Sequence, residues 1–207
     1  MILYDYCRSS AAYRVRIALN LKGLAYEQVP VNLLKSEQRG EENLARNPQG
    51  LVPSLDDNGE MLNQSLTMCE YLDEAYPETL QLLPSDVLER ARVRSLAQLI
   101  ACDIHPVNNL RILKYLVSEF GVTDEQKTAW YQHWVQEGFA ALERALADSD
   151  QTGKFCHGDD PTLADVLLVP QVFNANRFKV DMSVYPTIAR IADACNELKA
   201  FTDAHPD

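Results

Sequence analysis

Apolar positions in the first 80 residues change their spacing every ten to fifteen positions, which is typical of an α/β domain. Residues 1–6 predict a short strand, and residues 26–33 predict a second one. Between them, residues 13–22 carry apolar side chains at helical spacing and end at Gly23, a typical helix stop. The chain therefore opens with a β-α-β unit.

A hairpin and a helix complete this half of the chain. Residues 51–55 and 61–63 flank Asp57-Asn58-Gly59, a strong turn signal between two strands. Ser65 is expected to cap a helix that runs to Ala75. With one more short helix expected between the second strand and the hairpin, the order is β-α-β-α-β-β-α, which predicts a thioredoxin-like α/β domain over residues 1–80.

The remainder of the chain is predicted to be helical. Residues 77–84 are punctuated by proline and mark the expected domain boundary. Thr162 and Asp165 form an Asp variant of a capping box ahead of an apolar run, which indicates a buried central helix. The other amphipathic helical segments are residues 87–104, 108–120 and 128–146. We expect a second, all-α domain over residues 81–207, so that the fold class is an α/β domain followed by a helical one.

Composition is that of an ordinary globular protein, with 46% hydrophobic and 24% charged residues among 207. The formal net charge is -11, from 30 acidic and 19 basic side chains. Such a surface repels phosphate backbones and anionic lipids, so neither nucleic acid nor a membrane is an expected partner. An anionic small substrate would need a local cluster of arginine or lysine.

The start of the chain lacks a basic, apolar leader, and no run of about 18 apolar residues occurs, so we expect a cytoplasmic protein. The five cysteines are scattered, without C-x-x-C pairs or histidines at ligand spacing. No metal site or disulfide framework is expected. Most of Cys69, Cys102, Cys156 and Cys195 are expected to be buried as small hydrophobes.

The sharpest chemical feature lies between the first strand and the first helix, in residues 7–14. Backbone N–H groups at a helix N-terminus favour negative charge, and a serine hydroxyl there can donate a hydrogen bond to an anion. Ser9 and Ser10 thus offer a site for a thiolate. The alternative is that one of them is simply the N-cap that most helices need.

These residues also carry a family resemblance. Residues 8–19 are followed by Asn47-Pro48, Leu51-Val52-Pro53 and Gln64-Ser65, and later by residues 103–110, 162–165 and 177–181. In this order and spacing, the motifs resemble the zeta class of glutathione transferases, the family of the maleylacetoacetate and maleylpyruvate isomerases. The resemblance spans the whole chain.

The resemblance implies a glutathione site built mainly from the N-terminal domain. Ser9, with Ser10 as the second choice, would hydrogen-bond the glutathione sulfur and act in catalysis. Val52, ahead of a cis Pro53, would pair its backbone with the cysteinyl unit. Other implied glutathione contacts are Gln38 near the glycine end, Gln64 and Ser65 at the γ-glutamyl group, and His105 and Asn109 from the helical domain. For His105, a core or interface role is an equal alternative.

The implied reaction is the cis to trans isomerisation of a maleyl keto acid, by reversible addition of the glutathione thiolate to the C=C bond. The substrate is a dicarboxylate, and arginine is well suited to grip carboxylates through two parallel hydrogen bonds. Arg8, Arg111 and Arg177 are the candidates. Each arginine alone is also compatible with a solvated surface position.

Two substitutions separate this chain from the usual zeta pattern. Ala11 stands where a cysteine is common, so Ser9 and Ser10 must suffice for the chemistry. Cys7 stands where relatives tend to have an aromatic residue, and it creates Cys7-x-x-Ser10, which resembles the monothiol pattern of glutaredoxin-like proteins. A thiol near a helix N-terminus tends to have a lowered pKa. A Cys7-dependent thiol transferase is therefore the main rival hypothesis.

Three further questions stay open at this level. The substrate could derive from tyrosine breakdown, as maleylacetoacetate, or from gentisate breakdown, as maleylpyruvate. A non-catalytic, transferase-like scaffold is a third hypothesis for the function. The family also implies a homodimer, and Arg14 and Arg16 are expected to be structural, with a dimer interface as one place for them.

Overall fold

The computed structural model describes residues 1–206, which gather into two compact units. One unit contains Met1–Leu83 together with residues 196–206, and the other contains Pro84–Cys195. This differs from the expected domains 1–80 and 81–207, because the C-terminal segment belongs with the N-terminal unit. The reason is local packing, since short helix α9 (Lys199–Thr202) lies against α1 (Ser10–Leu21).

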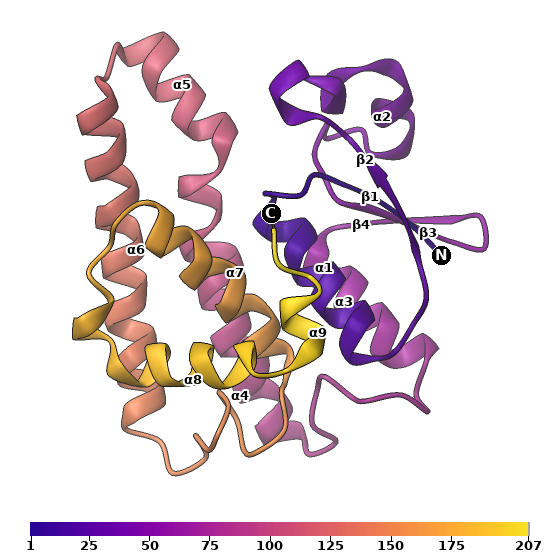
Figure 1. The fold of residues 1–207 in the computed structure, drawn as a ribbon, viewed down its shortest axis with the longest axis vertical. Helices are drawn as coiled ribbons and strands as arrows, with labels where there is room; N and C mark the ends of the chain where they lie inside the picture. Colours follow the sequence, from indigo (N-terminus) through magenta and orange to yellow (C-terminus); the bar gives the residue numbers. More distant parts are fainter. Residues whose placement is uncertain (207) are drawn as a thin grey trace. The chain divides into compact units, whose positions relative to one another are not determined.

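The first unit is built on a four-stranded sheet with the strand order β2-β1-β3-β4 (Figure 1). Strand β1 (Ile2–Asp5) runs parallel to β2 (Glu27–Pro30) and antiparallel to β3 (Ser54–Asp57). Strand β4 (Glu60–Asn63) pairs antiparallel with β3 as the expected hairpin. The predicted order of strands and helices in this half is confirmed.

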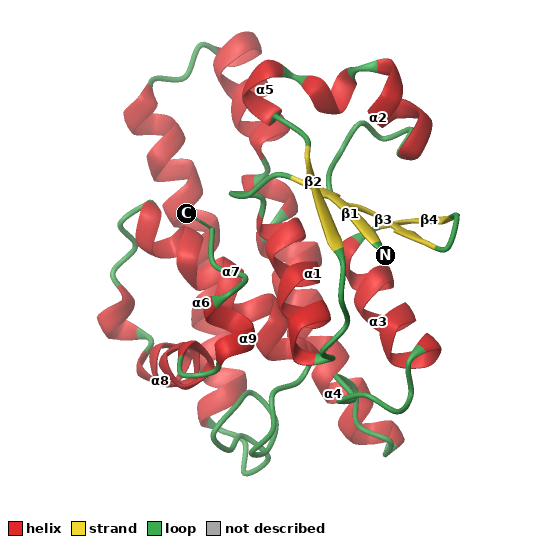
Figure 2. Cartoon of the chain, turned by 45° about the vertical axis from the view of Figure 1, so that its right-hand side comes forward, coloured by secondary structure: helices red, strands yellow, loops and turns green. Residues whose placement is uncertain are grey.

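Helices α1 and α3 (Ser65–Ala75) lie side by side on one face of this sheet (Figure 2). Their inward side chains form a buried core with the middle of the strands. Completely buried members of this core are Leu3, Ile17, Leu19, Leu55, Met68 and Leu72. The chain between β2 and β3 forms two short 3-10 helices, Leu33–Lys35 and Glu37–Arg39, and helix α2 (Glu41–Arg46).

The helix starts in this unit differ in detail from expectation. Ser9 is the N-cap of α1, which begins at Ser10, three residues before the predicted start. Ser65 does not cap α3 but is its first residue, and Gln64 occupies the cap position with φ 72° and ψ 115°. A positive φ at a residue other than glycine is uncommon and cannot be read from hydrophobic spacing.

The second unit is almost wholly helical, as predicted. Its elements are α4 (Val87–Gln98), a π-helical turn (Leu99–Ile104), a 3-10 turn (Pro106–Asn108), α5 (Leu110–Phe120), α6 (Asp124–Ala147), α7 (Leu163–Arg177), a 3-10 turn (Met182–Val184) and α8 (Pro186–Asn196). Helix α7 is buried over most of its length, which confirms the expected central helix. Within residues 1–206, no helix is both long and apolar enough to cross a membrane.

Asp165 joins the start of α7 to the loop before it. Its carboxylate accepts hydrogen bonds from the backbone N–H of Thr162 at 2.8 Å and of Cys156 at 2.8 Å, so the predicted capping box is confirmed. The side chain is completely buried, and this burial raises the pKa of Asp165 above its usual value. Cys156 and Cys195 are buried beside it, and Cys69 is buried in the first unit. Cys102 is exposed, so the expectation that most of these four cysteines are buried is confirmed.

Candidate functional site

The strand register gathers most of the predicted glutathione residues at one edge of the sheet. Tyr4 on β1 pairs with Ser54 at the start of β3, and Ser54 pairs with Asn63 at the end of β4. Strand β2 ends beside the end of β1, because the two strands are parallel. The segments that enter or leave the sheet at this edge are residues 6–9, 31–39, 52–53 and 64–65. They come together although they are up to 59 positions apart in the chain.

Ser9 holds its hydroxyl at the N-terminus of α1. Its Oγ accepts a hydrogen bond from the backbone N–H of Ala12 at 3.3 Å, and its own N–H donates to the Tyr6 carbonyl at 2.8 Å. A hydroxyl that accepts through one lone pair keeps its hydrogen available to donate elsewhere. Ser9 is half-buried, whereas Ser10 is 8% exposed, so Ser9 is the better placed of the two to meet a ligand.

The Val52–Pro53 peptide bond is cis, as the resemblance implied. Val52 is half-buried and Pro53 is buried directly ahead of β3. The next residue, Ser54, donates a hydrogen bond from its Oγ to Oδ1 of Asn63 at 2.8 Å. This bond fixes the start of β3 against the end of β4, immediately before Gln64.

Gln64 and Ser65 form the start of α3. Gln64 is exposed, and its Nε2 donates to Oε1 of Gln49 at 2.8 Å. Ser65 is 7% exposed, and its Oγ accepts a hydrogen bond from Nη1 of Arg14 at 3.3 Å. A helix N-terminus with a buried guanidinium beside it favours an anion, so this position suits a carboxylate.

Gln38 brings an unsatisfied acceptor to the same edge. Its side-chain Oε1 is buried and has no hydrogen-bond partner among residues 1–206. Its carbonyl accepts a hydrogen bond from Nδ2 of Asn43 at 3.1 Å, which holds the loop against α2. A buried acceptor without a partner is costly, so it is typical of a site that a ligand N–H completes.

A hollow of about 310 Å³ opens beside the loop before α1. It is lined by Asp5, Tyr6, Cys7, Gln28, Pro30 and Asn32. Cys7 is exposed and lies two residues before the N-cap of α1. Sequence reasoning missed Asp5 and Gln28, although a polar residue at the carboxyl end of the first strand, as Asp5 is, is a usable signal.

His105, Asn109 and Arg111 lie where the π-helical turn is followed by the start of α5. His105 is half-buried and ends the π-helical turn. Asn109 is the N-cap of α5, and its Oδ1 accepts from the backbone N–H of Arg111 at 3.1 Å. The Arg111 side chain is exposed and has no hydrogen bond or ion pair with the part of the chain that the structure describes, so it is available to a carboxylate.

The other two candidate arginines are also exposed. Arg177 ends α7, where its Nη1 donates to Oδ1 of Asn174 at 3.3 Å and its guanidinium lies 5.8 Å from the ring centroid of Phe173. Arg8 makes no hydrogen bond or ion pair with any residue from 1 to 206. Arg8, Arg111 and Arg177 come from three separate segments, and their convergence on one ligand remains a prediction.

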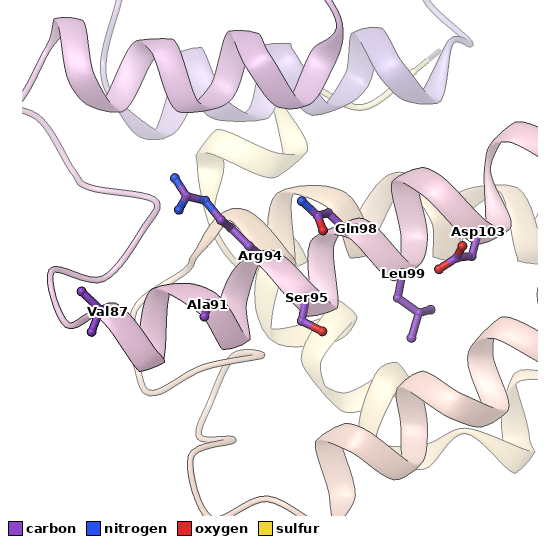
Figure 3. Close-up of a pocket in the computed structure, with 7 residues that line it drawn as sticks. All are labelled: Val87, Ala91, Arg94, Ser95, Gln98, Leu99 and Asp103. Atoms are coloured by element: carbon purple, nitrogen blue, oxygen red, sulfur yellow. The ribbon is translucent and has the colours of Figure 1, made fainter.

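Helix α4 carries a hollow that sequence reasoning did not foresee. It has a volume of about 510 Å³, and Figure 3 shows that its lining comes from α4 and the π-helical turn after it. Its lining residues are Val87, Ala91, Arg94, Ser95, Gln98, Leu99 and Asp103. None of them belongs to the predicted site, and their mixed chemistry, with one cation and one anion, differs from a dicarboxylate pocket.

Comparison with known proteins places both halves of the chain in one family. Residues 3–80 match the glutathione S-transferase N-terminal domain, and residues 126–206 match the C-terminal domain of the same family. The maleylacetoacetate isomerase of Rhizobium meliloti (strain 1021) is 52% identical over 206 residues, which cover all of this chain and 96% of the relative.

Two solved structures are similar over the full length of the chain. The holo structure of a maleyl pyruvate isomerase, a bacterial zeta-class enzyme, is 48% identical, has a TM-score of 0.97 and matches 100% of this chain and 97% of its own. The maleylacetoacetate isomerase of Anaeromyxobacter dehalogenans 2CP-1, with dicarboxyethyl glutathione and citrate in its active site, is 42% identical, with a TM-score of 0.86 and coverage of 100% and 90%. Sequence and fold agree on this assignment: the chain belongs to the glutathione S-transferase family and, within it, to the zeta class.

Proposed function

We propose that this protein is a glutathione-dependent cis–trans isomerase that converts maleylacetoacetate to fumarylacetoacetate. The observation that carries the proposal is the Ser9 hydroxyl, which is held as an acceptor by the N–H of Ala12 and therefore offers its hydrogen to an anion. The Rhizobium meliloti relative, named for this activity, adds support from 52% identity over the full chain.

The residues at the sheet edge fit glutathione by their chemistry. Ser9 at the start of α1 suits a thiolate, and Ser65 beside Arg14 suits the γ-glutamyl carboxylate. The unsatisfied Oε1 of Gln38 suits a peptide N–H near the glycine end. The backbone of Val52 and the side chain of Gln64 supply the remaining proposed contacts of the first unit, and His105 and Asn109 supply those of the second.

Glutathione, when bound, supplies a thiol that adds reversibly to the C=C bond, so that rotation about a single bond becomes possible. Ser9 stabilises the ionised sulfur by a hydrogen bond, together with the N–H groups of the first turn of α1. Arg8, Arg111 and Arg177 hold the substrate carboxylates. The Anaeromyxobacter dehalogenans relative binds a glutathione that carries two carboxyl groups on an ethyl unit, which is the kind of ligand this arrangement suits.

The test measures the disappearance of maleylacetoacetate and of maleylpyruvate by absorbance, each with and without glutathione. The proposal expects glutathione-dependent turnover, with maleylacetoacetate as the better substrate by kcat/KM. A preference for maleylpyruvate would instead assign the protein to gentisate breakdown, as an isomerase that catalyses the same class of reaction. If neither substrate is consumed, the isomerase proposal is refuted. If glutathione also fails to bind, the scaffold hypothesis is favoured.

A second candidate function is thiol transfer by Cys7. It is favoured by one observation, the exposed Cys7 side chain on the wall of the 310 Å³ hollow. Glutathione-dependent reduction of a mixed disulfide by wild-type protein, lost in Cys7→Ser, would support it.

We also propose a homodimer in the cytoplasm. Val87 and Leu88 on α4 are 65% and 78% exposed next to the 510 Å³ hollow, and apolar side chains this exposed favour coverage by a partner. Light scattering at micromolar concentration is expected to give twice the monomer mass, and a monomer would contradict the proposal. The free thiols at all five cysteines are compatible with a reducing compartment, which cell fractionation tests.

A further inference from the structure

Arg16 connects three parts of the first unit through one buried guanidinium. Its Nη1 donates to Oδ2 of Asp5 at 2.6 Å, its Nη2 to the carbonyl of Cys7 at 2.9 Å, and its Nε to the carbonyl of Ala204 at 3.0 Å. Arg16 is 4% exposed, so these bonds are shielded from water. The structural role expected for Arg16 is confirmed, and the side chain is enclosed within its own protomer.

The acceptor on Cys7 belongs to the loop that positions Ser9. The side chains of Cys7 and Arg8 are exposed, so side-chain packing does little to hold this loop in place. Two carbonyls hold it instead: Tyr6 accepts from the N–H of Ser9, and Cys7 accepts from Arg16. A displacement of the Cys7 carbonyl would therefore be transmitted to Ser9, two residues away.

Asp5 fixes the direction of the Arg16 guanidinium. It ends β1 and is 1% exposed, and its two carboxylate oxygens also accept from Nε2 of Gln28 on β2 at 3.0 and 2.9 Å. A carboxylate held on both sides gives a planar guanidinium a defined orientation, which a flexible ammonium could not take. The loop before α1 is thus tied to the sheet through the Asp5–Arg16 pair.

The C-terminal segment binds the same face of α1. Tyr13, Arg16 and Asn20, at helical spacing, donate to the carbonyls of Phe201, Ala204 and Ala200 at 3.5, 3.0 and 3.0 Å. Ala204 is 1% exposed, so its carbonyl has a fixed place. Of these three side chains, Arg16 is the one whose guanidinium also holds the Cys7 carbonyl, whereas Tyr13 meets the Ser9 carbonyl through its backbone N–H within the first turn of α1.

We propose that Arg16 is a positioning residue for the glutathione thiol, and that residues 196–206 support the site through the hydrogen bond from Arg16 to Ala204. This inference rests on the proposed function, because it takes Ser9 as the group that meets the sulfur. Arg16 itself touches neither glutathione nor substrate. Its effect is to hold the backbone from Cys7 to Ser9 in the position that lets the Ser9 hydroxyl reach the glutathione sulfur.

The test compares Arg16→Gln, Arg16→Lys and a chain ending at Thr202 with a matched control, Asn20→Ala. The control removes one hydrogen bond to the C-terminal segment but has no link to the Ser9 loop. For each variant, the dissociation constant of glutathione and the pKa of its bound thiol are measured, the latter from thiolate absorbance near 240 nm. Unfolding curves report the loss of stability separately.

Arg16→Gln and the shortened chain are expected to raise the bound thiol pKa by about one unit, a tenfold loss of thiolate preference, and to weaken glutathione binding about fivefold. For Arg16→Lys, the rise in the thiol pKa and the loss of glutathione affinity should both be smaller than for Arg16→Gln, because lysine keeps the charge but lacks the planar geometry. Asn20→Ala should lower stability and leave the thiol pKa at the wild-type value. The shortened chain keeps the test valid if Arg16→Gln does not fold.

The outcomes separate the inference from the proposed function. A wild-type protein that binds no glutathione refutes the proposed function and this inference with it. The positioning role alone is overturned by a different result. In that case the wild type binds and ionises glutathione, and Arg16→Gln and the shortened chain keep the thiol pKa and the glutathione affinity of Asn20→Ala.

Discussion

The hydroxyl of Ser9 accepts a hydrogen bond from the backbone N–H of Ala12 at 3.3 Å, so one side chain caps α1 and still has a hydrogen to donate to the proposed thiol. The two roles use different parts of the hydroxyl. The oxygen lone pair serves the helix, and the hydrogen remains for the ligand. Substitutions at Ser9 can therefore separate stability from activity.

Ser9→Ala is expected to lower kcat/KM by about 10²–10³ fold, since it removes a preorganised donor, and to cost about 1 kcal/mol of folding stability as a lost cap. Ser9→Gly is the matched variant, because glycine caps helices with a loss of only a few tenths of a kcal/mol. It should be as inactive as Ser9→Ala but nearly as stable as the wild type. Kinetics and urea unfolding measure the two effects, and full activity in Ser9→Gly would remove Ser9 from the mechanism.

Cys7→Ser tests the rival thiol chemistry. The Cys7 side chain is exposed, so its replacement should change stability little and alter isomerase kcat/KM by no more than about twofold. The isomerase and mixed-disulfide assays are run on the same preparation. Abolished isomerisation would show that Cys7, rather than Ser9, carries the reaction.

Gln64→Gly is expected to shift affinity without a large change in stability. Glycine relieves the positive φ of 72°, which offsets its entropic cost, so the free energy of unfolding should change by less than about 1 kcal/mol. The KM for glutathione should rise about tenfold, because the proposed contact to the γ-glutamyl group is lost.

Gln49→Ala is the control for this substitution. It removes the side-chain hydrogen bond to Gln64 but leaves the Gln64 amide in place, so its KM should rise less. Equal KM values for Gln64→Gly and the wild type would exclude Gln64 from the site.

Asp165→Asn tests the buried capping box. In the wild type, both oxygens of the carboxylate accept hydrogen bonds from backbone N–H groups. Asparagine would replace one of these oxygens with an NH₂ group that faces a donor, so the variant should be less stable by about 1–3 kcal/mol. Burial raises the pKa of Asp165 in the folded state, so the folded state binds the proton more tightly than the unfolded state. The contribution of this group to stability is then present below the ordinary carboxyl pKa and falls as pH rises through the raised value.

Urea unfolding of both proteins from pH 4 upward measures this pH dependence. The stability advantage of the wild type over Asp165→Asn should shrink as pH rises from about 4. An advantage that grows with pH would contradict a raised pKa at Asp165.

Local patterns predicted the elements well because local chemistry determines them. Asp57-Asn58-Gly59 forces the hairpin turn, and Thr162 with Asp165 starts the buried helix through contacts three residues apart. The cis bond before Pro53 was foreseen only through the family resemblance, because proline alone favours trans.

The unforeseen features depend on residues far apart in the chain. The positive φ of Gln64 follows from how β4 meets α3, which no spacing of apolar residues reports. The burial of Arg16 depends on Ala204, which is 188 positions away, and nothing near Arg16 in the sequence indicates an acceptor there. Gln38 was placed by resemblance, but its unsatisfied oxygen is a property of the folded loop.

The central claim is that Ser9 activates a thiol that is used catalytically and returned. The direct measurement follows fumarylacetoacetate formation and free thiol together, with maleylacetoacetate in large excess over glutathione. The account predicts many turnovers for each glutathione molecule with constant free thiol, and a collapse of this turnover in Ser9→Ala. Free thiol consumed in step with substrate, or product formed equally well without glutathione, would contradict it.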